Sequence, residues 1–275
     1  MDVGEKMAEE AALWQEMMDH RLHIRRYRVK SGKLKGSLRA VFLSDLHGSC
    51  YGENQEELLA RVHEAAPDVV FFGGDMADEK IPQENTNLLM KALGRRYSCY
   101  YVSGNHEFRK KRIREIKGRF REYGVHVLEG ACEKLVVNGN HICVCGVDDA
   151  AVGKAVFEEQ LGRLQRLCRF EEFTVLLAHR PELIGRYLEA PYDLVLAGHA
   201  HGGQWRLPGK VNGLFAPHQG LFPKYAGGMY RFGETQMVVG RGLTCERPKI
   251  PRIFNPPEIV VLDLAGSHRT HYGTC

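Results

Sequence analysis

Polar side chains able to bind metal ions follow five short apolar runs in this 275-residue sequence. The runs are RAVFLSDLHG (39–48), DVVFFGGDMAD (68–78), YYVSGNHE (100–107), TVLLAHR (174–180) and DLVLAGHAHGG (193–203). The polar residues that follow the apolar stretches are Asp45, His47, Asp75, Asp78, Asn105, His106, His179, His199 and His201. This set offers imidazole, carboxylate and amide donors without a thiolate, so it differs from a structural cysteine-rich zinc site.

These donors are costly to bury together without a cation. A carboxylate or imidazole left unpaired in the interior costs several kcal/mol, and two divalent metal ions at one site would remove that cost. Carboxylate and amide oxygens favour Mg or Mn, whereas imidazole favours Zn, Fe or Ni. The mixed donor set therefore leaves Mn, Fe and Zn open as cofactors.

The elements that must position these residues alternate along the chain. Runs this short and this rich in β-branched and aromatic residues are typical of buried strands. Helical patterns lie between them, around residues 54–65, 84–94, 109–123 and 155–168. Alternating strands and helices predict an α/β fold, in which ligands bind beyond the carboxyl ends of the strands. All five polar clusters fall at that end, and the sequence contains neither a dinucleotide fingerprint nor a phosphate loop.

The motifs DLH (45–47), GD (74–75), GNHE (104–107), a single histidine (179) and GHAH (198–201) resemble the five ordered motifs of the calcineurin-like metallophosphoesterases. The resemblance covers about residues 40–201. It implies a four-layer α/β/β/α sandwich of two mixed sheets. It also implies a binuclear metal-dependent phosphoesterase, in which a hydroxide bridging the two ions attacks phosphorus in an in-line displacement.

The resemblance assigns a role to each motif residue. It implies one metal ion held by Asp45, His47 and His201, and a second held by Asn105, His179 and His199. Asp75 would bridge the two ions. His106 matches the residue that protonates the leaving group, and Asp78 matches the carboxylate that orients this histidine. For Asp78, the cap of a helix N-terminus is an alternative that is compatible with this role.

Differences between this chain and the family motifs limit the range of expected substrates. Protein phosphatases of this superfamily continue GD as GDxVDRG, whereas this chain reads GDMADEK and lacks the phosphate-binding arginine. A phosphoprotein substrate is therefore not expected. Together with residues 202–233, the motifs GRGL (240–243) and NPPEIVVLDL (255–264) resemble a bacterial phosphodiesterase branch that includes relatives of UDP-diacylglucosamine hydrolases. This resemblance implies a phosphodiesterase acting on a phosphodiester or nucleotide-type small molecule, and it leaves open a lipid-linked pyrophosphate substrate and a peripheral membrane association. A nuclease and a catalytically weak, metal-bearing interaction scaffold are further alternatives.

Two segments outside the motifs could contact a substrate or a partner. Residues 202–233 are rich in glycine and aromatic residues, and we expect irregular hairpins beside the metal ions or a structural meander. The candidate substrate contacts in this segment are Trp205, Arg206, His218 and Lys224. Residues 109–121 carry eight basic residues on a predicted helix, which indicates a solvated face or a site for a polyanion or an anionic membrane. A net charge of only +4 makes nucleic acid the less favoured partner.

The expected organisation is an N-terminal helix and strand extension over residues 1–36, a metallophosphoesterase domain over 37–265 and a flexible tail over 266–275. The extension repeats apolar residues at helical spacing, which favours docking on the body and leaves a membrane or partner contact open. The residues with this spacing are Met7, Ala11, Trp14 and Met18.

The cellular compartment of the protein is inferred from its cysteine usage and its hydropathy. Eight cysteines are scattered without a C-x-x-C pair, which favours a reducing cytoplasm, and no 18-residue apolar run is present. Cys143 and Cys145 alternate in HICVCGV, so we expect both side chains on one strand face, packed as free apolar thiols. Nothing in the sequence indicates an oligomeric state.

Overall fold

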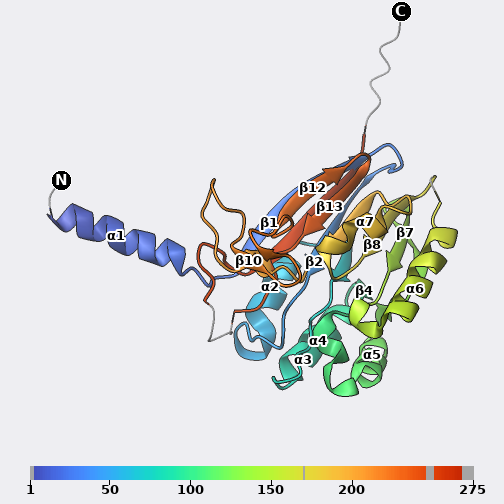
Figure 1. Ribbon diagram of the computed structural model, residues 1–275. Helices are drawn as coiled ribbons and strands as arrows, with labels where there is room; N and C mark the ends of the chain where they lie inside the picture. The colour runs from blue at the N-terminus through green and yellow to red at the C-terminus, as the bar shows by residue number, and fades with distance from the viewer. Residues whose placement is uncertain (1–2, 170, 246–250, 268–275) are drawn as a thin grey trace, which may run out of the picture.

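Two six-stranded mixed sheets form the centre of the protein in the computed structural model, which describes residues 3–169, 171–245 and 251–267 (Figure 1). The first sheet has the strand order β1(His23–Ser31), β14(Glu258–Gly266), β2(Ser37–Leu43), β3(Val69–Phe72), β4(Ser98–Tyr101) and β5(Val125–Val127). The second has the order β12(Gly228–Phe232), β13(Thr235–Val239), β9(Leu194–Ala197), β8(Phe173–Leu177), β7(Asn140–Gly146) and β6(Ala131–Val137). In each sheet, parallel central strands adjoin antiparallel pairs.

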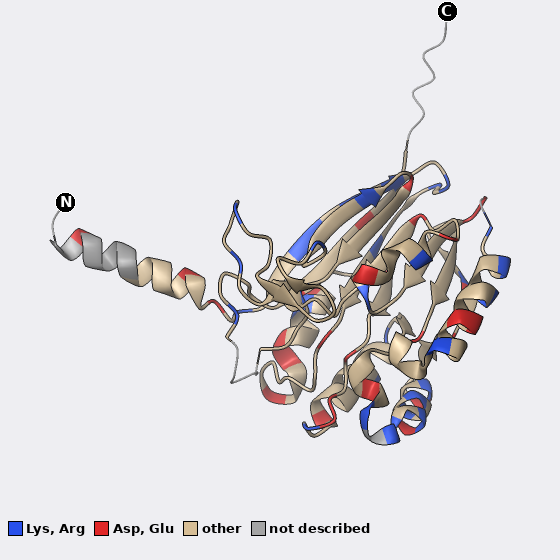
Figure 2. Ribbon diagram, in the orientation of Figure 1, with Lys and Arg blue, Asp and Glu red and all other residues tan. Residues whose placement is uncertain are grey.

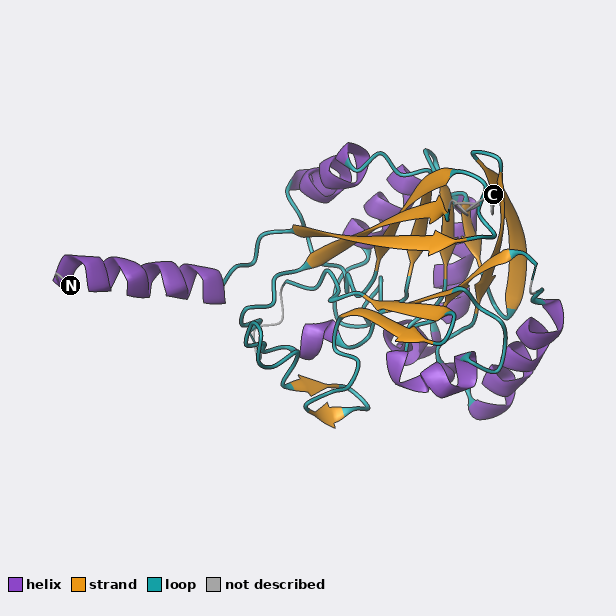
Figure 3. Cartoon of the chain, turned by 90° about the horizontal axis from the view of Figure 1, so that it is seen from above, coloured by secondary structure: helices purple, strands orange, loops and turns teal. Residues whose placement is uncertain are grey.

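Helices cover the outer face of each sheet, as Figure 3 shows from above. Beside the first sheet lie α2(Glu56–Glu64), α3(Glu84–Gly94) and α5(Ile113–Glu122), and beside the second lie α6(Lys154–Leu167) and α7(Ile184–Tyr187). Alternate residues of one strand pack into different layers, because successive side chains point to opposite faces of the sheet. In β2, Val41 and Leu43 pack towards the helices, whereas Phe42 packs against the other sheet. The predicted α/β/β/α sandwich is confirmed.

The predicted helices lie close to their expected positions, with one interruption. The helix expected at 109–123 is divided into a 3₁₀ turn, η2(Arg109–Lys111), and α5. Within α5, Ile116 and Phe120 are buried while Arg114 is exposed, so an apolar stripe packs on the body. The basic residues divide between solvent and the interior, since Lys117 is buried in ion pairs with Asp148 and Glu129. Figure 2 shows acidic and basic residues interspersed on α5 rather than a surface of one sign.

The N-terminal extension divides into two differently packed parts. All nine residues of β1 pair with β14, so the strand part of the extension is the edge strand of the first sheet. Helix α1(Val3–Met17) instead projects from the body (Figures 1 and 3), and Trp14 is 63% exposed, contrary to the expected docking. Of the predicted tail, residues 268–275 lie outside the described residues. Within the described ranges, no helix has the length and apolar character needed to span a membrane.

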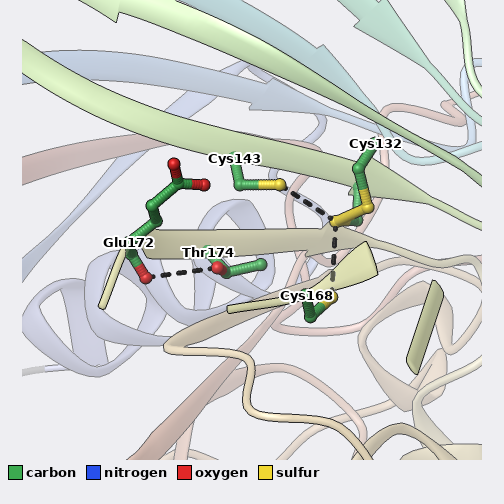
Figure 4. The surroundings of a disulfide bond; sticks show 6 residues. Cys132, Cys143, Cys168, Glu172 and Thr174 are labelled. Atoms are coloured by element: carbon green, nitrogen blue, oxygen red, sulfur yellow. Dashed lines mark hydrogen bonds between the residues drawn. A yellow bond between two sulfur atoms is a disulfide. The ribbon is translucent and has the colours of Figure 1, made fainter. Parts of the chain in front are cut away.

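The cysteines depart from the sequence-based interpretation. Cys145 forms a disulfide with Cys132, its partner across the β6–β7 pair, so treating Cys145 as a free thiol is wrong (Figure 4). The sulfur atoms of Cys143 and Cys168 lie 3.6 and 3.7 Å from that of Cys145. Cys143 and Cys145 do pack in one apolar cluster beneath α6, as expected. With a disulfide present, the cysteines no longer support a reducing compartment.

Substitutions in α1 and in the sheet should differ in their effect on the free energy of unfolding, because α1 projects from the folded body. Trp14→Ala removes an exposed side chain, so the free energy of unfolding should change by no more than about 0.5 kcal/mol. Leu262→Ala opens a cavity between the sheets and should cost about 2–5 kcal/mol. Urea denaturation followed by circular dichroism measures both. A large loss in the Trp14 variant would mean that α1 packs on the body in solution.

Candidate metal centre

All seven predicted metal ligands lie just beyond the carboxyl ends of five strands drawn from both sheets. Those from the first sheet follow β2, β3 and β4, and those from the second follow β8 and β9. Six of the seven side chains are almost inaccessible, since each of these residues is at most 4% exposed. These six are Asp45, His47, Asp75, His179, His199 and His201. The edges of the two sheets therefore meet at one buried polar cluster.

The cluster contains two groups of donors, of which the first has the residues of one implied ligand set and the second has Asp75 in place of Asn105. Donor atoms of Asp45, His47 and His201 lie within 4.8 Å of one another. A second set, formed by Asp75, His179 and His199, meets the same limit. Each group combines one carboxylate with two imidazoles, which is a donor set suited to a divalent cation.

Asp75 lies between the two groups. Its Oδ2 atom is 3.6 Å from Nε2 of His47 and 3.3 Å from Nε2 of His179. The amide oxygen of Asn105, the first residue of α4(Asn105–Phe108), is buried without a hydrogen-bond partner. A buried amide oxygen with no donor is an acceptor available to a cation, because burial without a partner is otherwise costly. The residues present thus fit a pair of metal ions.

The backbone of the cluster is strained in a way that aims the ligands inward. Asp45, His47, Asp75, His199 and His201 all have φ between 47° and 66°, in the left-handed region that non-glycine residues rarely adopt. Gly198 allows the close approach of the two sheets, since a Cβ atom there would lie 2.5 Å from Oδ2 of Asp45. That carboxylate also accepts a hydrogen bond from the backbone N–H of His199 at 3.0 Å. A side chain at this position would therefore push the two sheet edges apart.

Burial and neighbouring charges shift the pKa values of these groups in opposite directions. Burial raises the pKa of Asp45, and the nearby Asp75 carboxylate adds to this shift. Although burial also acts to raise the pKa of Asp75, His179 and His47 hold it well below its usual range. Burial, reinforced by the adjacent His179, lowers the pKa of His199 to about 2. Burial also acts to lower the pKa of His179, but Asp75 and Asp45 outweigh it and raise this pKa well above its usual range. These opposing shifts reflect the burial of carboxylates and imidazoles against one another.

His106 lies beside the cluster and contacts two acidic residues. Its Nδ1 atom is 3.0 Å from Oδ2 of Asp78 and 2.9 Å from Oε2 of Glu79. Burial acts to lower the pKa of His106, but Asp78 and Asp75 outweigh it and raise the pKa. The same Asp78 oxygen is 3.0 Å from Nδ1 of His47, so this carboxylate contacts both histidines. Asp78 caps no helix: it accepts the backbone N–H of Lys80 in a turn.

Glu107 has a structural function that the motif alone did not reveal. Its two carboxylate oxygens accept four backbone N–H groups at 2.7–3.1 Å, and the residue is fully buried. The donors are Asp75, Met76, Ala77 and Gly104. Glu107 therefore fixes the Asp75 loop to the start of α4. In the sequence, the indication of this role was the position of Glu107 as the last residue of the GNHE motif.

Of the four candidate substrate contacts in residues 202–233, one reaches the predicted ligands. His218 places Nδ1 2.8 Å from Nε2 of His199, and their rings stack at 5.0 Å. The Trp205 indole instead donates to the carbonyl of Pro251, and Arg206 donates to that of Gly202. Lys224 lies over the ring of Tyr225. The segment consists of irregular turns, one short hairpin, β10(Phe215–Ala216) and β11(Gly220–Leu221), and the sheet strand β12, so the expected irregular structure holds up to Gly227.

Comparison with known proteins agrees with this fold and cluster. The family model of the calcineurin-like phosphoesterases matches residues 38–203, and the chain belongs to this family. This match assigns residues 38–203 to a phosphoesterase domain.

Its relatives include an uncharacterized metallophosphoesterase, Cj0846 of Campylobacter jejuni, which is 31% identical over 86% of this chain. The chain spans 62% of the length of that relative. Another, YkuE of Bacillus subtilis, is 28% identical over 90% of this chain and 87% of its own length. Among solved structures, TT1561 of Thermus thermophilus has the same fold, with a TM-score of 0.51 and 14% identity over 75% of this chain and 90% of its own.

Replacing Glu107 by Gln should loosen the ligand loops and leaves every predicted ligand residue in the sequence. The amide keeps one oxygen but turns an NH₂ group towards two backbone donors, so the free energy of unfolding should fall by about 1–3 kcal/mol per unsatisfied group. Urea denaturation and elemental analysis of bound metal measure the effect. Glu115→Gln, on the exposed face of α5, is the matched control. Unchanged stability and metal content in Glu107→Gln would contradict the anchoring role.

Proposed function

We propose that the chain is a phosphodiesterase with two metal ions at this centre. In this proposal, Asp45, His47 and His201 hold one ion, and Asn105, His179 and His199 hold the other. Asp75 contacts both. When bound, the ions supply positive charge to the phosphoryl oxygens and a water of lowered pKa as the nucleophile. The observation that carries the proposal is the presence of two buried donor groups linked by Asp75, whose Oδ2 lies 3.6 Å from Nε2 of His47 in the first group and 3.3 Å from Nε2 of His179 in the second.

His106 is the proposed proton donor to the leaving group. Its contacts with Asp78 and Glu79 use Nδ1, which leaves Nε2 as the nitrogen that can serve the substrate. The raised pKa keeps a proton on the ring closer to neutral pH. A pocket of about 340 Å³ borders His106 and is large enough for part of a small-molecule leaving group. Asp78 and Glu79 are proposed positioning residues.

Glu79 supports a diester over a monoester substrate. It occupies the position of the arginine in the GDxVDRG motif, so a carboxylate replaces a phosphate-binding cation next to His106. Burial acts to raise the pKa of Glu79, but backbone and Arg109 hydrogen bonds lower it, and the group is ionised. A phosphate monoester carries up to two negative charges near neutral pH and a diester only one. Since Glu79 is paired with Arg109, the proposed preference rests on the missing motif arginine, a contact that a dianionic monoester would use more strongly than a diester.

Hydrolysis of bis(p-nitrophenyl) phosphate tests the proposed activity. Protein reconstituted with Mn should release p-nitrophenol faster from this diester than from p-nitrophenyl phosphate, since the motif arginine that a dianion would use is missing. EDTA should abolish the release, and added Mn should restore it. Absence of turnover with two ions bound would instead favour a metal-bearing interaction scaffold. A preference for the monoester would contradict the inference drawn from the missing motif arginine.

Two alanine variants separate proton donation from metal binding. His106→Ala should keep both ions and lose about 10²–10⁴-fold in turnover, the usual contribution of a positioned acid. Asp75→Ala should lose bound metal, because the carboxylate between the two groups is gone. Elemental analysis and p-nitrophenol release are measured on the same samples. Two ions retained in Asp75→Ala, or full turnover in His106→Ala, would refute the corresponding role.

A further inference from the structure

Large apolar side chains gather on the surface within a short stretch after β9. Five of them, between Trp205 and Phe222, are 42–68% exposed. We call this set the apolar rim: Trp205, Leu207, Phe215, Leu221 and Phe222. Elsewhere in the described chain, exposed large apolar residues occur singly, as at Leu88 and Val136, or as the smaller group of Leu13, Trp14 and Met18 at α1. Among the described residues, only the rim has five exposed large apolar side chains within eighteen consecutive residues.

Backbone hydrogen bonds join the rim residues into one surface. Phe215 pairs with Leu221 across the β10–β11 hairpin, and Phe222 donates to the carbonyl of Leu214. Leu214 in turn donates to the carbonyl of Trp205. Figure 3 shows the hairpin protruding from the edge of the body. The rim is thus a protruding, hydrogen-bonded structure with apolar side chains exposed on it.

The charged residues of the stretch that carries the rim have one sign. The sequence contains no aspartate or glutamate between Asp193 and Glu234, whereas it contains four basic residues there. They are Arg206, Lys210, Lys224 and Arg231. Lys210 and Lys224 are exposed beside the rim residues Leu207 and Phe222. A surface of this composition is complementary to a negatively charged one.

We propose that the apolar rim docks on the surface of an anionic phospholipid bilayer. Exposed aromatic and aliphatic side chains flanked by lysine, with no acidic residue, can enter the headgroup region while the lysines contact lipid phosphates. The Trp205 indole N–H is already satisfied by the carbonyl of Pro251, so burial of this side chain leaves no unpaired donor.

The rim adjoins the candidate metal centre. Leu214 donates to the carbonyl of Gly203, two residues after His201. His218, inside the same hairpin, contacts His199. Docking through the rim brings the centre close to the headgroup phosphates, and this consequence rests on the proposed function. The docking itself does not depend on it.

Vesicle sedimentation with the full chain tests the proposal. Vesicles of phosphatidylcholine alone and with about 30% phosphatidylglycerol separate apolar from charge-dependent binding. The wild-type protein should sediment with the anionic vesicles and less with the neutral ones. Leu221→Ser combined with Phe222→Ser should weaken this binding at least about tenfold, since two large apolar side chains are removed. Val136→Ser, similarly exposed on the distant strand β6, is the matched control and should bind as wild type.

Four outcomes overturn the proposal. These are no sedimentation of the wild type with anionic vesicles, equal binding by the double variant, equal loss in the control, or a dimer that the double variant dissociates without lipid. The last outcome assigns the rim to a second copy of the chain. Hydrolysis of bis(p-nitrophenyl) phosphate without vesicles should be unchanged in the double variant, because neither residue belongs to the catalytic machinery. If the proposed function is wrong, the wild-type protein shows no hydrolysis in this assay, and the vesicle-binding result is unaffected.

Discussion

The burial of carboxylates and imidazoles where two sheet edges meet is the constraint on which the remaining structure depends. Water cannot solvate these groups, so they must be satisfied by one another and by cations. The chain holds this arrangement with strained backbone at five ligands and with a glycine, Gly198, where a side chain would collide with Asp45. Four hydrogen bonds to Glu107 fix the loop that carries Asp75. The surrounding residues thus serve to keep the donors close together.

The fold and the predicted ligands could be read from the sequence because each ligand directly follows a buried strand. Parallel strands place their carboxyl ends at one edge, so identifying β3 as a strand was enough to place Asp75. The functions of Glu79 and Glu107 could not be read this way, since their contacts lie about 30 residues away along the chain. The disulfide likewise depends on the register between β6 and β7, which places Cys132 opposite Cys145.

Helix α1 shows a second limit of sequence patterns. Its apolar spacing indicates a helix with one apolar side but does not identify what that side contacts. The adjoining strand β1 was assigned to the same extension, yet it is an edge strand of the first sheet. A hydrophobic pattern determines the type of an element more reliably than its partner, because the partner depends on the whole fold.

The segment that follows β9 joins the two surfaces of interest. It begins with His199 and His201, passes through Gly203 and continues into the apolar rim without an acidic residue. Because Leu214 and Phe222 are tied by backbone hydrogen bonds to this ligand segment, displacing the rim would strain the backbone that carries two ligands. The rim and two of the predicted ligands therefore belong to one short, hydrogen-bonded stretch of chain.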